Sequence, residues 1–152
     1  MTITYEGPLE PGWIDYNGHL RDAYYALIFS YATDRLMELI GLDAAGRKAQ
    51  AATLYTLEAH LLYLAEVKGD AAVRVCTTLL AHDAKKIHLL HALHVAGRDG
   101  PAAVGEQLLI HIDTASGRSA PMGEGLLAAV RALVAVAGDG APYAGRAIAL
   151  RR

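Results

Sequence analysis

Residues 13–41 read WIDYNGHLRDAYYALIFSYATDRLMELIG, in which a polar cluster is followed by a long segment with helical spacing. Apolar side chains recur every three or four residues after Asp22, which predicts an amphipathic helix that Asp22 caps and Gly41 ends. The polar cluster at 15–19 then lies at the positive end of the helix dipole, where free backbone N–H groups can polarise a carbonyl oxygen. The predicted apolar face comprises Tyr25, Ile28, Phe29, Ala32, Leu36, Leu39 and Ile40.

Five other segments have strand-like patterns, and a second amphipathic helix follows them. Short turns separate the later strands, which predicts antiparallel neighbours. One strand, one long helix and four further strands indicate an α+β domain in which a single antiparallel sheet curls around the helix. The predicted strands cover 2–6, 53–67, 73–82, 87–95 and 103–113, and the second helix covers 124–137 and ends at Gly138.

The segment 53–67 fits a helix by composition and a half-buried strand by alternation, and we favour the strand. Glu58 and His60 then project side by side from one face of an interior strand, together with Thr56. An unpaired carboxylate is costly in such a place, so Glu58 needs a polar partner unless the face is exposed. The opposite, apolar face is predicted to carry Tyr55, Leu57, Ala59, Leu61 and Tyr63.

Length and composition favour a single domain over 1–152, in which 139–152 is an extended C-terminal tail. The formal charge of −2 gives no basic field for nucleic acid. The one cysteine, Cys76, excludes an intrachain disulfide. No signal-like segment and no apolar run long enough to span a bilayer is seen, so we expect a soluble, cytoplasmic protein with no membrane partner.

The order of elements, the cluster at 15–19 and the helix start Ala23-Tyr24-Tyr25 resemble the hotdog-fold acyl-CoA thioesterases, especially the 4-hydroxybenzoyl-CoA thioesterase-like branch. The resemblance spans essentially the whole chain. It implies a five-stranded antiparallel sheet wrapped around a long central helix, with a C-terminal helix. It also implies an active site between two subunits, and hence a homodimer or homotetramer.

A narrower resemblance connects the chain to the betainyl-CoA thioesterase module attached to some carnitine dehydrogenases. It is carried by five segments, although Leu20-Arg21-Asp22 stands where that module usually continues with Met-Asn. The segments are Trp13 to His19, Leu57-Glu58-Ala59-His60, Tyr63-Leu64-Ala65-Glu66-Val67, Lys85-Lys86-Ile87-His88 and Pro142-Tyr143-Ala144-Gly145-Arg146.

Thioester hydrolysis needs an activated water or nucleophile and a donor for the developing oxyanion. Asp15 matches the family's aspartate, which implies a general base or a nucleophile that forms a mixed anhydride; the alternative is a turn-stabilising aspartate. The N–H groups of Gly18 and His19, or the Asn17 amide, can face the oxyanion, although each can equally serve the turn. Glu58 is predicted to hold water, to orient His19 or Asn17, or to balance a cationic acyl group.

Aromatic rings beside a carboxylate suit a quaternary ammonium, so the acyl pocket is predicted to combine rings with Glu58 and His60. The alternative is that the rings pack the helix on the sheet around a neutral acyl chain. Lys85 and Lys86 are candidates for the CoA phosphates, as are Arg118 and Arg146. The predicted rings are Trp13, Tyr16, Tyr24, Tyr25 and Tyr63.

These features predict an acyl-CoA thioesterase that releases free acid and CoA. The alternatives are a noncatalytic acyl-CoA-binding module and a hotdog dehydratase or hydratase. No glycine-rich nucleotide motif or serine nucleophile elbow is present, so no bound cofactor is expected. No metal is expected either, because strand alternation turns His91 away from His88 and His94.

Overall fold

The computed structural model describes residues 2–136 and 142–148. The predicted long helix, the five long strands and the second helix are all present, with bounds that differ by a few residues. The elements are β1 (Thr2–Pro8), the 3-10 turn η1 (Pro11–Trp13), α1 (Asp22–Leu39), α2 (Ala44–Gln50), β2 (Ala52–Tyr63), β3 (Ala72–His82), β4 (Lys86–Val95), β5 (Ala103–Asp113), β6 (Arg118–Ser119) and α3 (Glu124–Val136).

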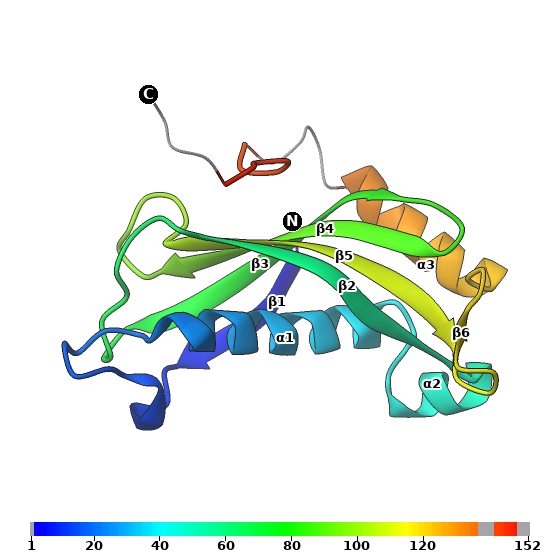
Figure 1. The fold of residues 1–152 in the computed structure, drawn as a ribbon, viewed down its shortest axis with the longest axis horizontal. Coiled ribbons are helices and arrows are strands. Elements are labelled where there is room, and N and C mark those ends of the chain that lie inside the picture. The colour runs from blue at the N-terminus through cyan, green and yellow to red at the C-terminus, as the bar shows by residue number, and fades with distance from the viewer. Residues whose placement is uncertain (1, 137–141, 149–152) are drawn as a thin grey trace.

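All strand pairs are antiparallel, in the spatial order β1-β3-β4-β5-β2, and the short β6 adds to β5. The sheet curls, and α1 lies along one of its faces (Figure 1). The prediction that β2 is an interior strand is wrong. Short turns join β3, β4 and β5 into consecutive hairpins, so β2 pairs only with the free side of β5 and forms an edge.

The apolar face of α1 packs into the concave side of the sheet. Ile28, Phe29 and Leu36 have no exposed surface. Gly105 permits this close approach, because a Cβ at that position would lie 2.6 Å from Cδ2 of Phe29. Burying each such side chain contributes about 1.5–3 kcal/mol, which fixes α1 and thereby the loop that precedes it.

Two predicted details of α1 are wrong. Asp22 is the first helical residue rather than the cap; Arg21 occupies the cap position without a side-chain bond, and Asp22 Oδ1 accepts the Ala23 N–H at 2.9 Å. Leu39 is 43% exposed. The chain turns directly after α1, so that Ile40 and Leu42 are buried at this end of the helix in its place.

Helix α2 was not predicted because seven residues are too few to show an amphipathic period. Its start is nevertheless encoded locally: Asp43 is the N-cap, and its Oδ1 accepts the Gly46 N–H at 2.7 Å. Arg47 and Lys48 lie in the last turn, where positive charge suits the helix dipole.

A bulge in β2 overturns the predicted alternation of this strand. The pairing register shifts between Thr56 and Glu58, so Leu57 has no direct partner on β5. Tyr55 pairs with Ile110, and Glu58 pairs with Leu108. Tyr55 therefore lies on the same outer face as Glu58 rather than on the apolar face with Tyr63.

The C-terminal part lies outside the sheet. The predicted end of the last helix at Gly138 falls outside the described residues, as does part of the predicted tail. Residues 142–145 form a turn rather than extended chain, and this segment lies over the sheet face opposite α1 (Figure 1). None of the described helices combines the length and apolar character that crossing a membrane requires.

Candidate active site

The loop at 14–20 is a tight hairpin closed by its own backbone. Ile14 pairs with Leu20, and the Asp15 N–H donates to the His19 carbonyl at 2.9 Å. The Gly18 N–H donates to the Asp15 carbonyl at 3.1 Å, and Gly18 has a φ of +81°. A residue with a side chain rarely adopts that conformation, which is the local reason for glycine at this position.

The carboxylate of Asp15 folds back over this hairpin. Its Oδ1 accepts the N–H of Asn17 at 2.8 Å and the N–H of His19 at 3.1 Å. The bond from His19, the bond from Asn17 and the nearby charge of Arg21 together hold the pKa of Asp15 below its usual value. Asp15 is therefore ionised at neutral pH. Among the described residues no hydrogen bond reaches Oδ2, so this oxygen can bind a water.

The same contacts limit the possible oxyanion donors. The N–H groups of Gly18 and His19, which the sequence offered as donors, are both engaged inside the hairpin. In this conformation the side-chain amide of Asn17 and the imidazole of His19 are the polar donors next to Asp15. Both line the same open pocket as the Asp15 side chain.

This pocket, here called the Asp15 pocket, has a volume of about 400 Å³. It lies between the hairpin, the start of α1 and the chain that follows β2. Glu66, on that last segment, places Oε2 3.4 Å from Nε2 of His19. The pocket is lined by Asp15, Asn17, His19, Leu20, Asp22, Tyr25, Tyr63, Leu64, Ala65 and Glu66.

Only two of the five predicted rings line this pocket. Tyr25 and Tyr63 meet edge to face with centroids 5.2 Å apart, and the Tyr63 hydroxyl donates to the Asp22 carbonyl at 3.3 Å. Burial raises the pKa of both phenols, which are therefore neutral. Trp13 stacks on Tyr24 at 5.7 Å, and both rings pack against the core. Tyr16 is 93% exposed and points to solvent.

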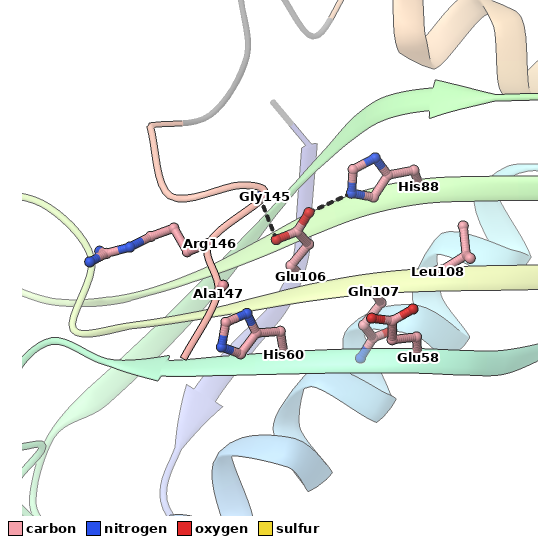
Figure 2. A pocket seen from close by; sticks show the side chains of 9 residues that line it. All are labelled: Glu58, His60, His88, Glu106, Gln107, Leu108, Gly145, Arg146 and Ala147. Atoms are coloured by element: carbon pink, nitrogen blue, oxygen red, sulfur yellow. Dashed lines mark hydrogen bonds and ion pairs between the residues drawn. The ribbon is translucent and has the colours of Figure 1, made fainter. Parts of the chain in front are cut away.

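Glu58 and His60 lie elsewhere, in a second pocket of about 470 Å³ on the sheet face opposite α1. Figure 2 shows them beside His88 and Glu106, beneath the C-terminal segment. We call this the outer pocket; it is lined by Glu58, His60, His88, Glu106, Gln107, Leu108, Gly145, Arg146 and Ala147. Within one chain Glu58 therefore cannot orient His19 or Asn17, one of the three roles predicted for it, because its pairing with Leu108 turns its side chain to the sheet face opposite α1.

Glu106 is the central residue of the outer pocket. Its Oε1 lies 2.6 Å from Nε2 of His88, and its Oε2 accepts the Gly145 N–H at 2.8 Å (Figure 2). Sequence reasoning did not single out Glu106. Three of the five segments that carry the narrower resemblance nevertheless meet here, through His60, His88 and Gly145.

Comparison with known proteins gives consistent matches across the chain. The model of the thioesterase-like superfamily matches residues 9–130. The chain belongs to this superfamily. The betainyl-CoA thioesterase of Pseudomonas aeruginosa is 53% identical over 133 residues, which are 88% of this chain and 84% of that protein. These matches make the chain a thioester hydrolase.

Two further relatives agree. The L-carnitine dehydrogenase/betainyl-CoA thioesterase of Agrobacterium fabrum is 41% identical over 127 residues, covering 83% of this chain and 26% of that longer protein. A Staphylococcus aureus protein solved in complex with CoA has a TM-score of 0.90 at 26% identity, covering 99% of this chain and 98% of that one. The resemblance to the betainyl-CoA thioesterases that the motifs indicated is thus confirmed.

Lys85 and Lys86, the predicted phosphate ligands of this thioesterase, lie far from the Asp15 pocket of their own chain. Both backbone N–H groups donate to Asp83 Oδ1 at 2.7 Å in the turn before β4. Lys86 pairs with Ile110 of β5, whereas Tyr63 pairs with Ala103 at the other end of that strand. Seven residues of extended strand separate these positions, about 24 Å.

The histidines of β4 do not converge either. His91 pairs with Gly105 on the face toward α1, whereas His88 and His94 face the other side, as the alternation predicts. Within 2–136 and 142–148, no three His, Cys, Asp or Glu side chains are grouped to hold a metal ion.

Proposed function

We propose that this thioesterase hydrolyses a small acyl-CoA, specifically betainyl-CoA, in the Asp15 pocket. The observation that carries the proposal is the Asp15 carboxylate, which is ionised at neutral pH, fixed through Oδ1 and open at Oδ2. The acyl group is inferred from the Pseudomonas aeruginosa relative, whose name states that substrate.

In the proposed reaction, Asp15 Oδ2 accepts a proton from a water that attacks the thioester carbonyl carbon. The developing oxyanion accepts hydrogen bonds from the Asn17 amide or the His19 imidazole, which line the same pocket. Collapse of the tetrahedral intermediate breaks the C–S bond. The proton held by Asp15 passes to the departing sulfur, so the products are the free acid and CoA.

We further propose the hotdog arrangement and an assembly of two or four copies. The curled sheet along α1 supports the fold, and the edge position of β2 supports the assembly. A second copy also supplies the phosphate-binding lysines that one chain cannot bring to its own Asp15 pocket. Lys85 and Lys86 lie too far from their own Asp15, so they are proposed to bind the phosphates of CoA held in the pocket of a neighbouring copy.

A thiol-release assay over a panel of acyl-CoAs tests the proposal. We expect CoA thiol to appear with betainyl-CoA, and to appear more slowly with acetyl-CoA and with a long-chain acyl-CoA. Binding of these thioesters without thiol release would instead support the acyl-CoA-binding module. Gain or loss of a double bond without thiol release would support the hydratase or dehydratase.

A further inference from the structure

We propose that Glu66 is the counter-ion that makes the Asp15 pocket selective for a positively charged acyl group. This inference rests on the proposed hydrolysis in that pocket and assigns its specificity to one residue. It replaces the sequence-based role of Glu58, which lines the outer pocket on the other side of the sheet.

The chemistry of the substrate restricts where the counter-ion can lie. In a betainyl thioester one methylene separates the ammonium nitrogen from the carbonyl carbon that water attacks. A carboxylate that balances the ammonium must therefore share a pocket with Asp15. Glu66 meets this condition, because His19 connects the two: its N–H donates to Asp15 Oδ1 at 3.1 Å and its Nε2 lies 3.4 Å from Glu66 Oε2.

The backbone around Glu66 is fixed while its side chain is free to turn. The Ala65 N–H donates to the Ala102 carbonyl at 2.9 Å, and the Val67 carbonyl accepts the Leu20 N–H at 2.8 Å. The Glu66 side chain itself is 79% exposed. Its carboxylate can thus turn from His19 toward a bound cation without moving the chain.

The other two carboxylates of the pocket have different tasks. Asp15 Oδ1 holds the hairpin, and Asp22 Oδ1 accepts the Ala23 N–H in the first turn of α1. Tyr25 and Tyr63 also line the Asp15 pocket and favour a cationic acyl group, because neutral phenol rings attract a quaternary ammonium while excluding water from its methyl groups. Glu66 supplies the charge that these rings lack.

The test compares betainyl-CoA with 3,3-dimethylbutanoyl-CoA, in which carbon replaces the ammonium nitrogen at the same size. For the wild-type protein we expect kcat/KM to favour the cationic thioester. Glu66→Gln is expected to lower kcat/KM for betainyl-CoA about tenfold relative to the neutral thioester, mainly through a higher KM, which is the scale of one lost charge contact. Glu66→Asp should recover part of the preference.

Glu38→Gln is the matched control, since Glu38 is an exposed glutamate paired with Arg35 near the other end of α1. It should leave the preference as in the wild type. Equal cleavage of both thioesters by the wild type, or an equal loss with both in Glu66→Gln, would overturn the role of Glu66 while thiol release upholds the thioesterase. Absence of thiol release from either thioester would instead contradict the proposed function itself.

Discussion

Nδ1 of His91 lies 2.7 Å from Oγ1 of Thr77, in a polar chain sealed between α1 and the sheet. Nε2 of His91 meets Oγ1 of Thr33 at 3.0 Å, and Thr77 continues to Thr4 Oγ1 at 2.6 Å. The ring of Phe29 stacks on the imidazole with centroids 5.6 Å apart. Burial lowers the pKa of His91 to about 3, so the folded protein holds this imidazole neutral.

The free energy of unfolding should therefore decrease as the pH is lowered below about 6.5. The folded-state pKa of His91 lies below the unfolded value of 6.5, so the unfolded chain binds a proton first and gains stability from it. The slope is expected to steepen below pH 6.5 and to reach about 1.4 kcal/mol per pH unit near pH 5, where the unfolded imidazole is almost fully protonated and the folded one is still neutral. Between the unfolded and the folded pKa, titration of His91 lowers the free energy of unfolding by at most on the order of 5 kcal/mol.

Urea unfolding at several pH values measures this slope. His91→Gln should lower stability at pH 7 but flatten the slope, because the amide does not titrate. His82→Gln, which changes a half-buried histidine at the end of β3, should keep the wild-type slope. The aspartates whose pKa values are lowered, Asp15, Asp83 and Asp113, lose their contributions only at more acidic pH. Identical slopes in the wild type and His91→Gln would exclude His91 as the source.

The main helices and strands can be predicted from the local sequence pattern. The sheet face on which a side chain lies depends in addition on how its strand pairs with a neighbouring strand. Period and turn spacing predict α1 and the strands, because both are properties of neighbouring residues. The outward turn of Tyr55 could not be predicted, because a bulge depends on the register with β5. Helix α2 is likewise set by the cap of Asp43 rather than by any periodicity.

The same distinction applies to the site. The sequence predicts the grouping of Asp15, Asn17 and His19, because they lie within five residues of one another. Glu66 cannot be assigned from the sequence, since it is placed beside His19 by long-range backbone contacts: the Leu20 N–H donates to the Val67 carbonyl, and His19 pairs with Lys68. Lys85 and Lys86 cannot be assigned from one chain, because their proposed role requires a second copy.

Glu106 should hold the C-terminal segment on the sheet. It accepts the Gly145 N–H and pairs with His88, so Glu106→Ala removes a charge-assisted anchor. We expect trypsin to cleave after Arg146 severalfold faster in this variant, because cleavage follows the population of the released segment. Mass spectrometry of the fragments measures the rate. Glu106→Gln keeps an acceptor oxygen and should give an intermediate rate, whereas equal rates in all three proteins would argue against this anchor.

The edge strand β2 should mediate self-association. Its twelve residues include Tyr55, Leu57 and Tyr63, each more than half exposed, whereas the opposite edge β1 exposes only Ile3 among its large apolar side chains. A long apolar edge favours pairing with another chain, and a lysine there opposes it. Light scattering at micromolar concentration is expected to show a dimer or tetramer for the wild type. Leu57→Lys should shift it toward monomer, and Ile3→Lys should not; a monomeric wild type would contradict the assembly.

Asp15→Asn should lower the turnover of acyl-CoA at least about a hundredfold while the fold and CoA affinity remain. The amide oxygen of asparagine can still accept the N–H groups of Asn17 and His19, so the hairpin is kept, but the amide cannot take a proton from water. Thiol release measures turnover, and calorimetric titration with CoA measures binding. Asp34→Asn, on the exposed side of α1, is the charge-matched control and should retain wild-type turnover.

The pH dependence gives an independent check on Asp15. A general base acts only when deprotonated, and hydrogen bonds lower the pKa of Asp15 from 3.8. Protonation of Asp15 should therefore cause no loss of kcat/KM between pH 7 and 5. The decrease of kcat/KM that its protonation causes should begin below pH 5, under conditions in which the protein is still folded. Near-native turnover in Asp15→Asn would reject Asp15 as the base, and the water would then have to be activated by another group of the pocket, such as His19 or Glu66.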